Sequence, residues 1–191
     1  MNNFKYIAFY KPFGVLTQFT GEPGDKTLSD FNFPPNVYAA GRLDKDSEGL
    51  LILTDDGVFN QKLTNPNSHK EKTYWVQVEN IPTQAAIEEL KSGVRIKDYH
   101  TKKCLVRPIS EPDLPPRTPP IRQRKNIPTA WLEIKISEGK NRQVRRMTAK
   151  IGHPTLRLIR VGMGKFELDQ FTPGIWKYIA CLLYTSPSPR D

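Results

Sequence analysis

The 191-residue chain is 37% hydrophobic and 26% charged, a composition that suits one globular domain with a proper core or two small lobes sharing a cleft. No apolar run approaches the roughly 20 residues of a membrane span, and the N-terminus has no cleavage-site pattern, so we expect a cytoplasmic protein without membrane contact. The two cysteines, Cys104 and Cys181, form no CxxC pair, which argues against a disulfide framework and a structural zinc site.

The N-terminal part of the chain is predicted to contain short strands and one helix. A strand at 5–11 ends at a turn signal of proline and glycine. The apolar run at 50–53 predicts a buried strand, and Asp55 or Asp56 can cap the helix that follows it. Residues 72–79 alternate as a half-buried strand does.

The C-terminal part is predicted to mix helices and strands. We expect helices at 83–93 and 141–152, and strands within 94–97 and 103–109 and at 129–137 and 155–163. Seven prolines in residues 108–128 argue against regular structure there and predict a long, locally stiff loop. The irregular order of elements and the short connections predict an α+β fold on a mixed, mostly antiparallel sheet.

The positive charge of the chain is concentrated in two segments. The formal net charge is +9 at pH 7, and residues 138–160 hold seven lysines and arginines against one glutamate, whereas residues 116–128 hold four and no acid. Together they account for the whole excess of positive charge. Such clustering is typical of proteins that bind a polyanion such as nucleic acid, although each segment alone could be a charged helix face or a solvated loop.

The predicted helix at 141–152 carries arginines where they do not help it. Arg142, Arg145 and Arg146 lie in its first turns, where the macrodipole is already positive. Amide donors and guanidinium groups at that end would together hold a phosphate or carboxylate. The arrangement therefore indicates an anion site, the alternative being basic side chains that snorkel on an exposed face.

The stretch GRLDKDSEGLLILTDDG, at 41–57, holds five of the twenty acidic residues. Its acidic positions match part of a calcium-loop template, but the ninth position is Ile52 in an apolar run and neither flank predicts a long helix. A two-metal nuclease would need further carboxylates that no other segment clearly supplies. Asp44, close to Arg42, suits one ionised carboxylate at the edge of a cleft, and we expect Asp46 and Glu48 to be structural or to face solvent.

The same stretch resembles the catalytic motif of the pseudouridine synthases, in the branch typified by the small-subunit rRNA enzyme. Four more stretches resemble motifs of this branch in the same order: KPFGVLTQF at 11–19, KTYWV at 72–76, EGKNRQVRRM at 138–147 and LRLIRVGMGKFEL at 156–168. The five motifs extend over nearly all of residues 4–179. The resemblance implies the fold of this family, with two lobes flanking a central catalytic cleft.

The resemblance also implies an activity and a set of roles. The reaction is the isomerisation of uridine to pseudouridine in ribosomal RNA, which requires no cofactor and no metal. Asp44 matches the catalytic aspartate and Tyr74 the tyrosine that stacks on the target base. Arg145 matches the basic residue that is expected to pair with Asp44.

RNA binding is expected to involve the basic residues around this carboxylate. Arg42 matches a position that contacts the flipped-out nucleotide or fills the space it leaves. Lys140, Arg142 and Arg146 would hold the flanking phosphates. The implied partner is ribosomal RNA, either 23S rRNA or a large-subunit assembly intermediate, bound by a monomer.

The resemblance implies one catalytic domain at 1–179, without the S4-like RNA-binding domain that other members of the branch carry at the N-terminus. Residues 180–191 continue no family pattern, and we expect a disordered tail there. Two other functions remain open from the residues alone: an RNA-binding module without catalysis, and a metal-dependent nuclease.

Overall fold

The computed structural model describes residues 3–122 and 124–181, so most of the predicted tail, 182–191, lies outside the described residues. The helices in this part are α1 (Gly57–Thr64), α2 (Gln84–Ser92) and α3 (Gln143–Lys150), with short 3₁₀ helices at Leu28–Phe31 and Pro66–Ser68. The strands are β1 (Tyr6–Lys11), β2 (Tyr38–Ala39), β3 (Glu48–Thr54), β4 (Lys72–Glu79), β5 (Arg95–Ile96), β6 (Tyr99–His100), β7 (Leu105–Ile109), β8 (Thr129–Ile136), β9 (Thr155–Met163), β10 (Phe166–Glu167) and β11 (Trp176–Tyr178).

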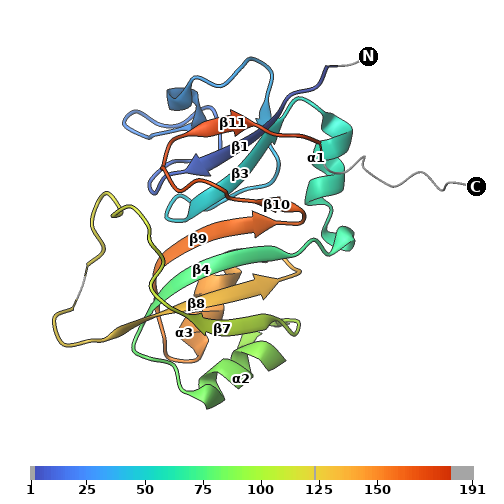
Figure 1. The fold of residues 1–191 in the computed structure, drawn as a ribbon. Coiled ribbons are helices and arrows are strands. Elements are labelled where there is room, and N and C mark those ends of the chain that lie inside the picture. Colours follow the sequence, from blue (N-terminus) through green and yellow to red (C-terminus); the bar gives the residue numbers. More distant parts are fainter. Residues whose placement is uncertain (1–2, 123, 182–191) are drawn as a thin grey trace, which may run out of the picture.

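Within the described residues, nine strands form one mixed sheet in the order β11-β1-β3-β9-β4-β8-β7, with β2 beside β3 and β10 beside β9. The pairing of β3 with β9 is parallel, and the other pairings between strands in this sheet are antiparallel. The parallel pairing joins an N-terminal half, with β1 and β3, to a second half, with β4, β8 and β7 (Figure 1). The predicted α+β fold with a mostly antiparallel sheet is confirmed, and one sheet is continuous through both expected lobes.

The parallel junction is short and depends on a glycine. It pairs Glu48 with Ile159 and Gly49 with Arg160. Gly49 has a φ of +105°, and a Cβ at this position would lie 2.3 Å from the carbonyl oxygen of Arg160. Only glycine permits this conformation and this approach of the two strands, so Gly49 brings β9 directly beside the end of the acidic stretch.

Hydrophobic clusters cover both faces of β3. Leu50 and Ile52 pack in one cluster with Phe59 of α1, and the alternate residues Leu51 and Leu53 pack in another. A strand that is buried on both faces has a continuous apolar sequence, which explains the run at 50–53. In the second half, α2 and α3 lie on one side of the sheet near β7 and β8 (Figure 1) and pack with β4 and β8 in a third cluster.

Local sequence signals located most of the longer elements correctly. The strands predicted at 72–79 and 155–163 have those bounds in the structure, and Asp56 and Thr83 cap α1 and α2. The proline-rich loop begins later than predicted, because Pro108 belongs to β7. This strand is at the edge of the sheet, where a proline, which lacks an N–H group, can be accommodated without the loss of a hydrogen bond between strands.

The two-residue strands β2, β6 and β10 and the three-residue strand β11 were not predicted, because such short elements contain less than one repeat of a periodic pattern. Among the described residues, no helix combines the length and apolar character that crossing a membrane requires.

Candidate active site

A cleft of about 990 Å³ opens beside the junction of the two halves. Its walls come from the loop after β2, from the start of β4 and from the loop between β8 and α3. Five of the predicted site residues line it: Arg42, Asp44, Tyr74, Lys140 and Arg142. Arg145 and Arg146, on α3, are not among the lining residues. The fold therefore brings together side chains that are up to 100 positions apart in the sequence.

The loop that carries Asp44 is held by backbone hydrogen bonds. The amide of Ser47 donates to the carbonyl of Asp44 at 3.0 Å, and the amide of Gly14 donates to the carbonyl of Lys45 at 2.7 Å. On the other side, the Thr17 hydroxyl donates to the carbonyl of Leu43 at 2.6 Å. The backbone on both sides of Asp44 is thus tied to the segment that follows β1. The Asp44 side chain is 37% exposed to solvent.

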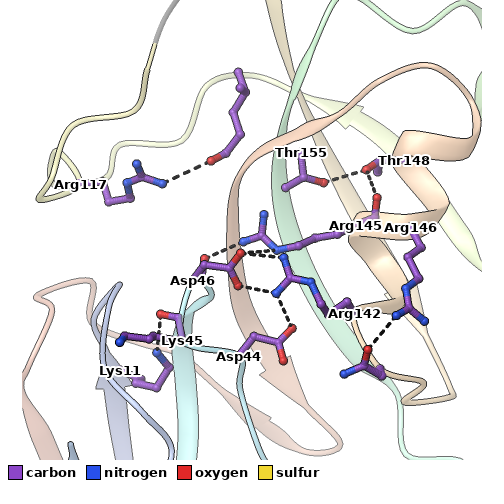
Figure 2. A network of polar contacts seen from close by, with 12 residues as sticks. Lys11, Asp44, Lys45, Asp46, Arg117, Arg142, Arg145, Arg146, Thr148 and Thr155 are labelled. Carbon is purple, nitrogen blue, oxygen red and sulfur yellow. Dashed lines mark hydrogen bonds and ion pairs between the residues drawn. The ribbon is translucent and has the colours of Figure 1, made fainter. Parts of the chain in front are cut away.

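Arg142, rather than Arg145, is the arginine beside Asp44 (Figure 2). The ion pair between Arg142 Nη1 and Asp44 Oδ2 measures 3.6 Å, and the same guanidinium donates two hydrogen bonds of 2.9 and 2.8 Å to Asp46. Arg145 instead donates to the backbone carbonyl of Asp46 at 2.6 Å, and its Nε lies 3.5 Å from the Asp46 carboxylate. The expected pairing of Arg145 with Asp44 is therefore not the one in the structure.

The backbone of Arg142 explains this difference. The residue is the N-cap of α3 and has a φ of +52°, so it does not belong to the helix that was predicted to begin at Asn141. Asn141 accepts a hydrogen bond from Arg146 at 2.9 Å instead of capping the helix. Because Arg142 precedes the helix in a left-handed conformation, its side chain can reach the loop with Asp44 and Asp46.

Asp46 acts as an anchor for the arginines. Hydrogen bonding from Arg142, together with the charges of Arg145 and Arg142, holds the pKa of the Asp46 carboxyl below its usual value despite partial burial. Burial lowers the pKa of Arg145, whose Nε has no hydrogen-bond partner among the described residues. Asp46 is therefore structural, as its sequence position suggested, and it orients both guanidinium groups.

Tyr74 and the basic residues occupy different depths of the cleft. Tyr74 is 9% exposed and packs in the cluster that includes α3. Lys140 lies nearer the rim, with its Nζ 4.5 Å from the centre of the Tyr99 ring. Arg42 lines the cleft as well. The cleft thus has a buried aromatic ring on its floor and exposed positive charge at its rim, which suits a flat base attached to a phosphate backbone.

Sequence analysis missed Glu138, which organises the basic loop. One carboxylate oxygen accepts hydrogen bonds from the Tyr99 hydroxyl and the Lys102 amide, at 2.9 and 2.7 Å. The other accepts one from Gln143 at 2.7 Å. The signal was a single acidic residue within a strongly basic segment, but two of its three donors, Tyr99 and Lys102, come from a distant part of the chain and could not be predicted from this segment.

Lys11 was also missed, because a lysine at the end of a strand gives no sign of burial. The residue is fully buried, and its Nζ donates to the carbonyls of Pro12 and Val15 at 2.9 and 2.8 Å. A third contact, of 3.5 Å, reaches the carbonyl of Lys45, next to Asp44. Lys11 therefore links the turn after β1 to the loop that carries Asp44 (Figure 2).

Replacing Lys11 with methionine should change the pH dependence of stability. Burial lowers the pKa of Lys11 from 10.5 to about 7. Between these values the unfolded chain binds more protons than the folded one, so this lysine makes the free energy of unfolding rise with pH, by roughly 1 kcal/mol per pH unit. Urea unfolding of the wild type and Lys11→Met at pH 6 to 9 should show this rise in the wild type alone, above pH 7. Parallel pH profiles would contradict the prediction.

Two acidic residues near the cleft are paired with arginines. Asp46 is held by Arg142, and Glu48 accepts two hydrogen bonds of 2.9 Å from Arg157. Among residues 3–122 and 124–181, no three His, Cys, Asp or Glu side chains are grouped so that they could hold a metal ion.

Comparisons with known proteins identify the family of this chain. The pattern of the family described as RNA pseudouridylate synthase matches residues 5–150. The chain is 56% identical over 176 residues to "Ribosomal large subunit pseudouridine synthase E" of Vibrio vulnificus (strain CMCP6), covering 92% of this chain and 75% of that protein. It is 54% identical to the protein of the same name from Xanthomonas axonopodis pv. citri (strain 306), covering 87% of this chain and 90% of the other.

A solved structure described as "Crystal structure of pseudouridylate synthase" superposes with a TM-score of 0.77 at 25% identity, covering 94% of this chain and 72% of that one. The match extends over both halves of the sheet and therefore over the cleft between them. Fold, motifs and sequence identity lead to one assignment: the chain belongs to the RNA pseudouridylate synthase family.

Proposed function

We propose that this protein isomerises a uridine of large-subunit ribosomal RNA to pseudouridine, with Asp44 as the catalytic carboxylate. The observation that carries the proposal is the state of this side chain. Asp44 lines the cleft, is partly exposed and accepts no side-chain hydrogen bond from the described residues, whereas Glu138, which also lines the cleft, is held by three donors. A carboxylate with free lone pairs beside a guanidinium is suited to act on a bound ribose.

The neighbouring side chains support roles for each step. A uridine that is stacked or paired in RNA must be flipped out before its ribose can reach Asp44. The ring of Tyr74 on the cleft floor suits stacking on the flipped base, and Arg42 suits contact with the extruded nucleotide or the space that it leaves. Arg145 acts through Asp46, as a positioning residue for the loop.

The rim of the cleft suits a phosphate backbone. Lys140, Arg142 and Arg146 lie around the start of α3, and the sequence of the 110–128 loop adds four basic residues. One of these, Arg117, lies 4.1 Å from the ring of Phe13 and so ties this loop to the turn beside the catalytic loop. We propose that both segments bind phosphates that flank the target. We also propose that the protein acts as a monomer in the cytoplasm.

Primer extension on large-subunit rRNA, after carbodiimide treatment that marks pseudouridine, tests this function directly. Incubation of the purified protein with free 23S rRNA and with assembly intermediates should create a single new stop. Asp46 and Glu48 are paired with arginines, and the described residues hold no group of three side chains suited to a metal ion, so we expect the stop to form equally well with a chelator present. Chelator-sensitive cleavage of the RNA would favour a nuclease, and RNA binding without any stop would favour a module without catalysis.

A further inference from the structure

A buried guanidinium nitrogen of Arg160 has no partner. Arg160, on β9, is 2% exposed, and its Nε donates to the carbonyl of Leu50 at 2.9 Å. Its Nη2 is buried and has no hydrogen-bond partner within the part of the chain that the structure describes. Arginine carries donors only, and buried donors in proteins are nearly always satisfied. The place beside Nη2 is therefore suited to an acceptor that the chain itself does not supply.

Lys72 is a second cation at the same place. The residue begins β4 and lines the cleft with Arg160. Its Nζ reaches only the carbonyl of Glu138, at 3.4 Å, and it makes no ion pair among the described residues. Burial, and then the charge of Arg160, lower the pKa of Lys72. Two cations thus line the same cleft, and neither forms an ion pair within the described residues.

The strand register places both cations beside the tyrosine of the cleft floor. Tyr74 is directly opposite Arg160 in the antiparallel pair of β4 and β9, so their side chains point to the same face of the sheet. Lys72 precedes Tyr74 by two residues and also shares this face. A base that stacks on Tyr74 would therefore present an edge toward these two donors.

We propose that Arg160, assisted by Lys72, donates a hydrogen bond to a carbonyl oxygen of the target uracil and stabilises the negative charge that the base acquires. This inference rests on the proposed function. When the bond from C1′ to N1 breaks, its electron pair stays with the base, whose charge spreads from N1 to the two carbonyl oxygens. C1′ is left electron-deficient beside the Asp44 carboxylate. Bonding of C5 to C1′ neutralises both charges, and the proton that C5 then loses is balanced by the proton that N1 takes up.

The depth of the site favours the base over a phosphate as its occupant. Arg160 is almost fully buried on the floor, whereas Lys140 and Arg142 are exposed. A donor that is preorganised in a water-poor site acts most strongly on charge that develops during the reaction. Arg160 should therefore affect the rate of conversion more than the affinity for RNA.

Single-turnover conversion of a synthetic RNA fragment, with the target position identified by primer extension, tests the inference. Arg160→Met should slow conversion by about 10- to 100-fold, the effect of one charge-assisted hydrogen bond, with the Kd for the fragment changed by less than about twofold. Lys72→Met should slow it less, and Arg160→Lys should restore part of the rate. Arg107→Met, which removes an exposed charge on the edge strand β7, serves as the control and should leave both values unchanged.

Sulfur substitution in the RNA separates a contact with the base from a purely structural role. Sulfur accepts hydrogen bonds poorly, so 2-thiouridine or 4-thiouridine at the target should slow the wild type, and that extra slowing should vanish in Arg160→Met. If each sulfur substitution slows both proteins by the same factor, Arg160 does not contact the base and the inference is wrong, whatever the melting temperature of the variant. If the wild type creates no stop on free rRNA or on assembly intermediates, the proposed function itself fails.

Discussion

Asp44→Asn should reduce pseudouridine formation by about 10²- to 10⁴-fold, the range for loss of a group that acts directly on the substrate, while the Kd for RNA stays within about twofold. The amide has the same shape as the carboxylate but lacks its charge and nucleophilicity. Arg142 keeps its two hydrogen bonds to Asp46, and the loop keeps its backbone hydrogen bonds, so the cleft should remain intact. Single-turnover kinetics and filter binding on the same rRNA fragment measure the two quantities.

Asp55→Asn is the matched control for this experiment. Asp55 belongs to the same acidic stretch but pairs with Lys5 at 2.7 Å and does not line the cleft. Its replacement should leave the rate of conversion unchanged, although it removes the same charge. Turnover that survives in Asp44→Asn would show that this carboxylate is not the catalytic group.

Arg157→Met should lower the free energy of unfolding by about 3–5 kcal/mol, because it leaves a buried charge without a partner. Glu48 and Arg157 are 2% and 5% exposed and share two hydrogen bonds of 2.9 Å. The hydroxyl of Tyr10 donates to the same carboxylate at 3.3 Å. Since Glu48 lies at the parallel junction and follows the loop that carries Asp44, we also expect the variant to convert uridine more slowly.

Urea unfolding followed by circular dichroism measures this loss, and a double variant provides the control. Replacing both members of a buried ion pair with apolar residues of similar size removes the unpaired charge. Glu48→Leu combined with Arg157→Met should therefore recover much of the stability that Arg157→Met loses. If the double variant is less stable than Arg157→Met alone, the prediction is wrong. The ion pair would then contribute more to the stability of the junction than the absence of an unpaired charge explains.

Local patterns were sufficient for the elements that repeat over several residues. The alternation at 72–79, the capping side chains Asp56 and Thr83, and the glycine that ends α2 act through neighbours in the sequence, so the sequence could show them. The first turn of α3 is the instructive exception. A left-handed conformation at Arg142 delays the start of the helix, and its side chain binds Asp46, 96 residues away.

The same distinction applies to the site. The sequence indicated that Asp44, Tyr74 and the arginines of 142–146 belong together, because they resemble motifs of one family. It could not show that Glu138 is held by three donors, that Lys11 is buried beneath the catalytic loop, or that Arg160 keeps an unpaired donor. Burial and hydrogen-bond partners are properties of the environment of a residue rather than of its type.

By itself, the sequence determined the family, the longer strands and helices and the identity of the acidic and basic motifs, because these depend on residue order and local periodicity. Only the tertiary structure decided which arginine is beside Asp44 and which cations share the cleft floor with Tyr74. The first relation follows from the left-handed backbone at Arg142, and the second from the register of β4 on β9, which pairs Tyr74 with Arg160. Such pairings depend on how the whole sheet packs, and no local pattern encodes them.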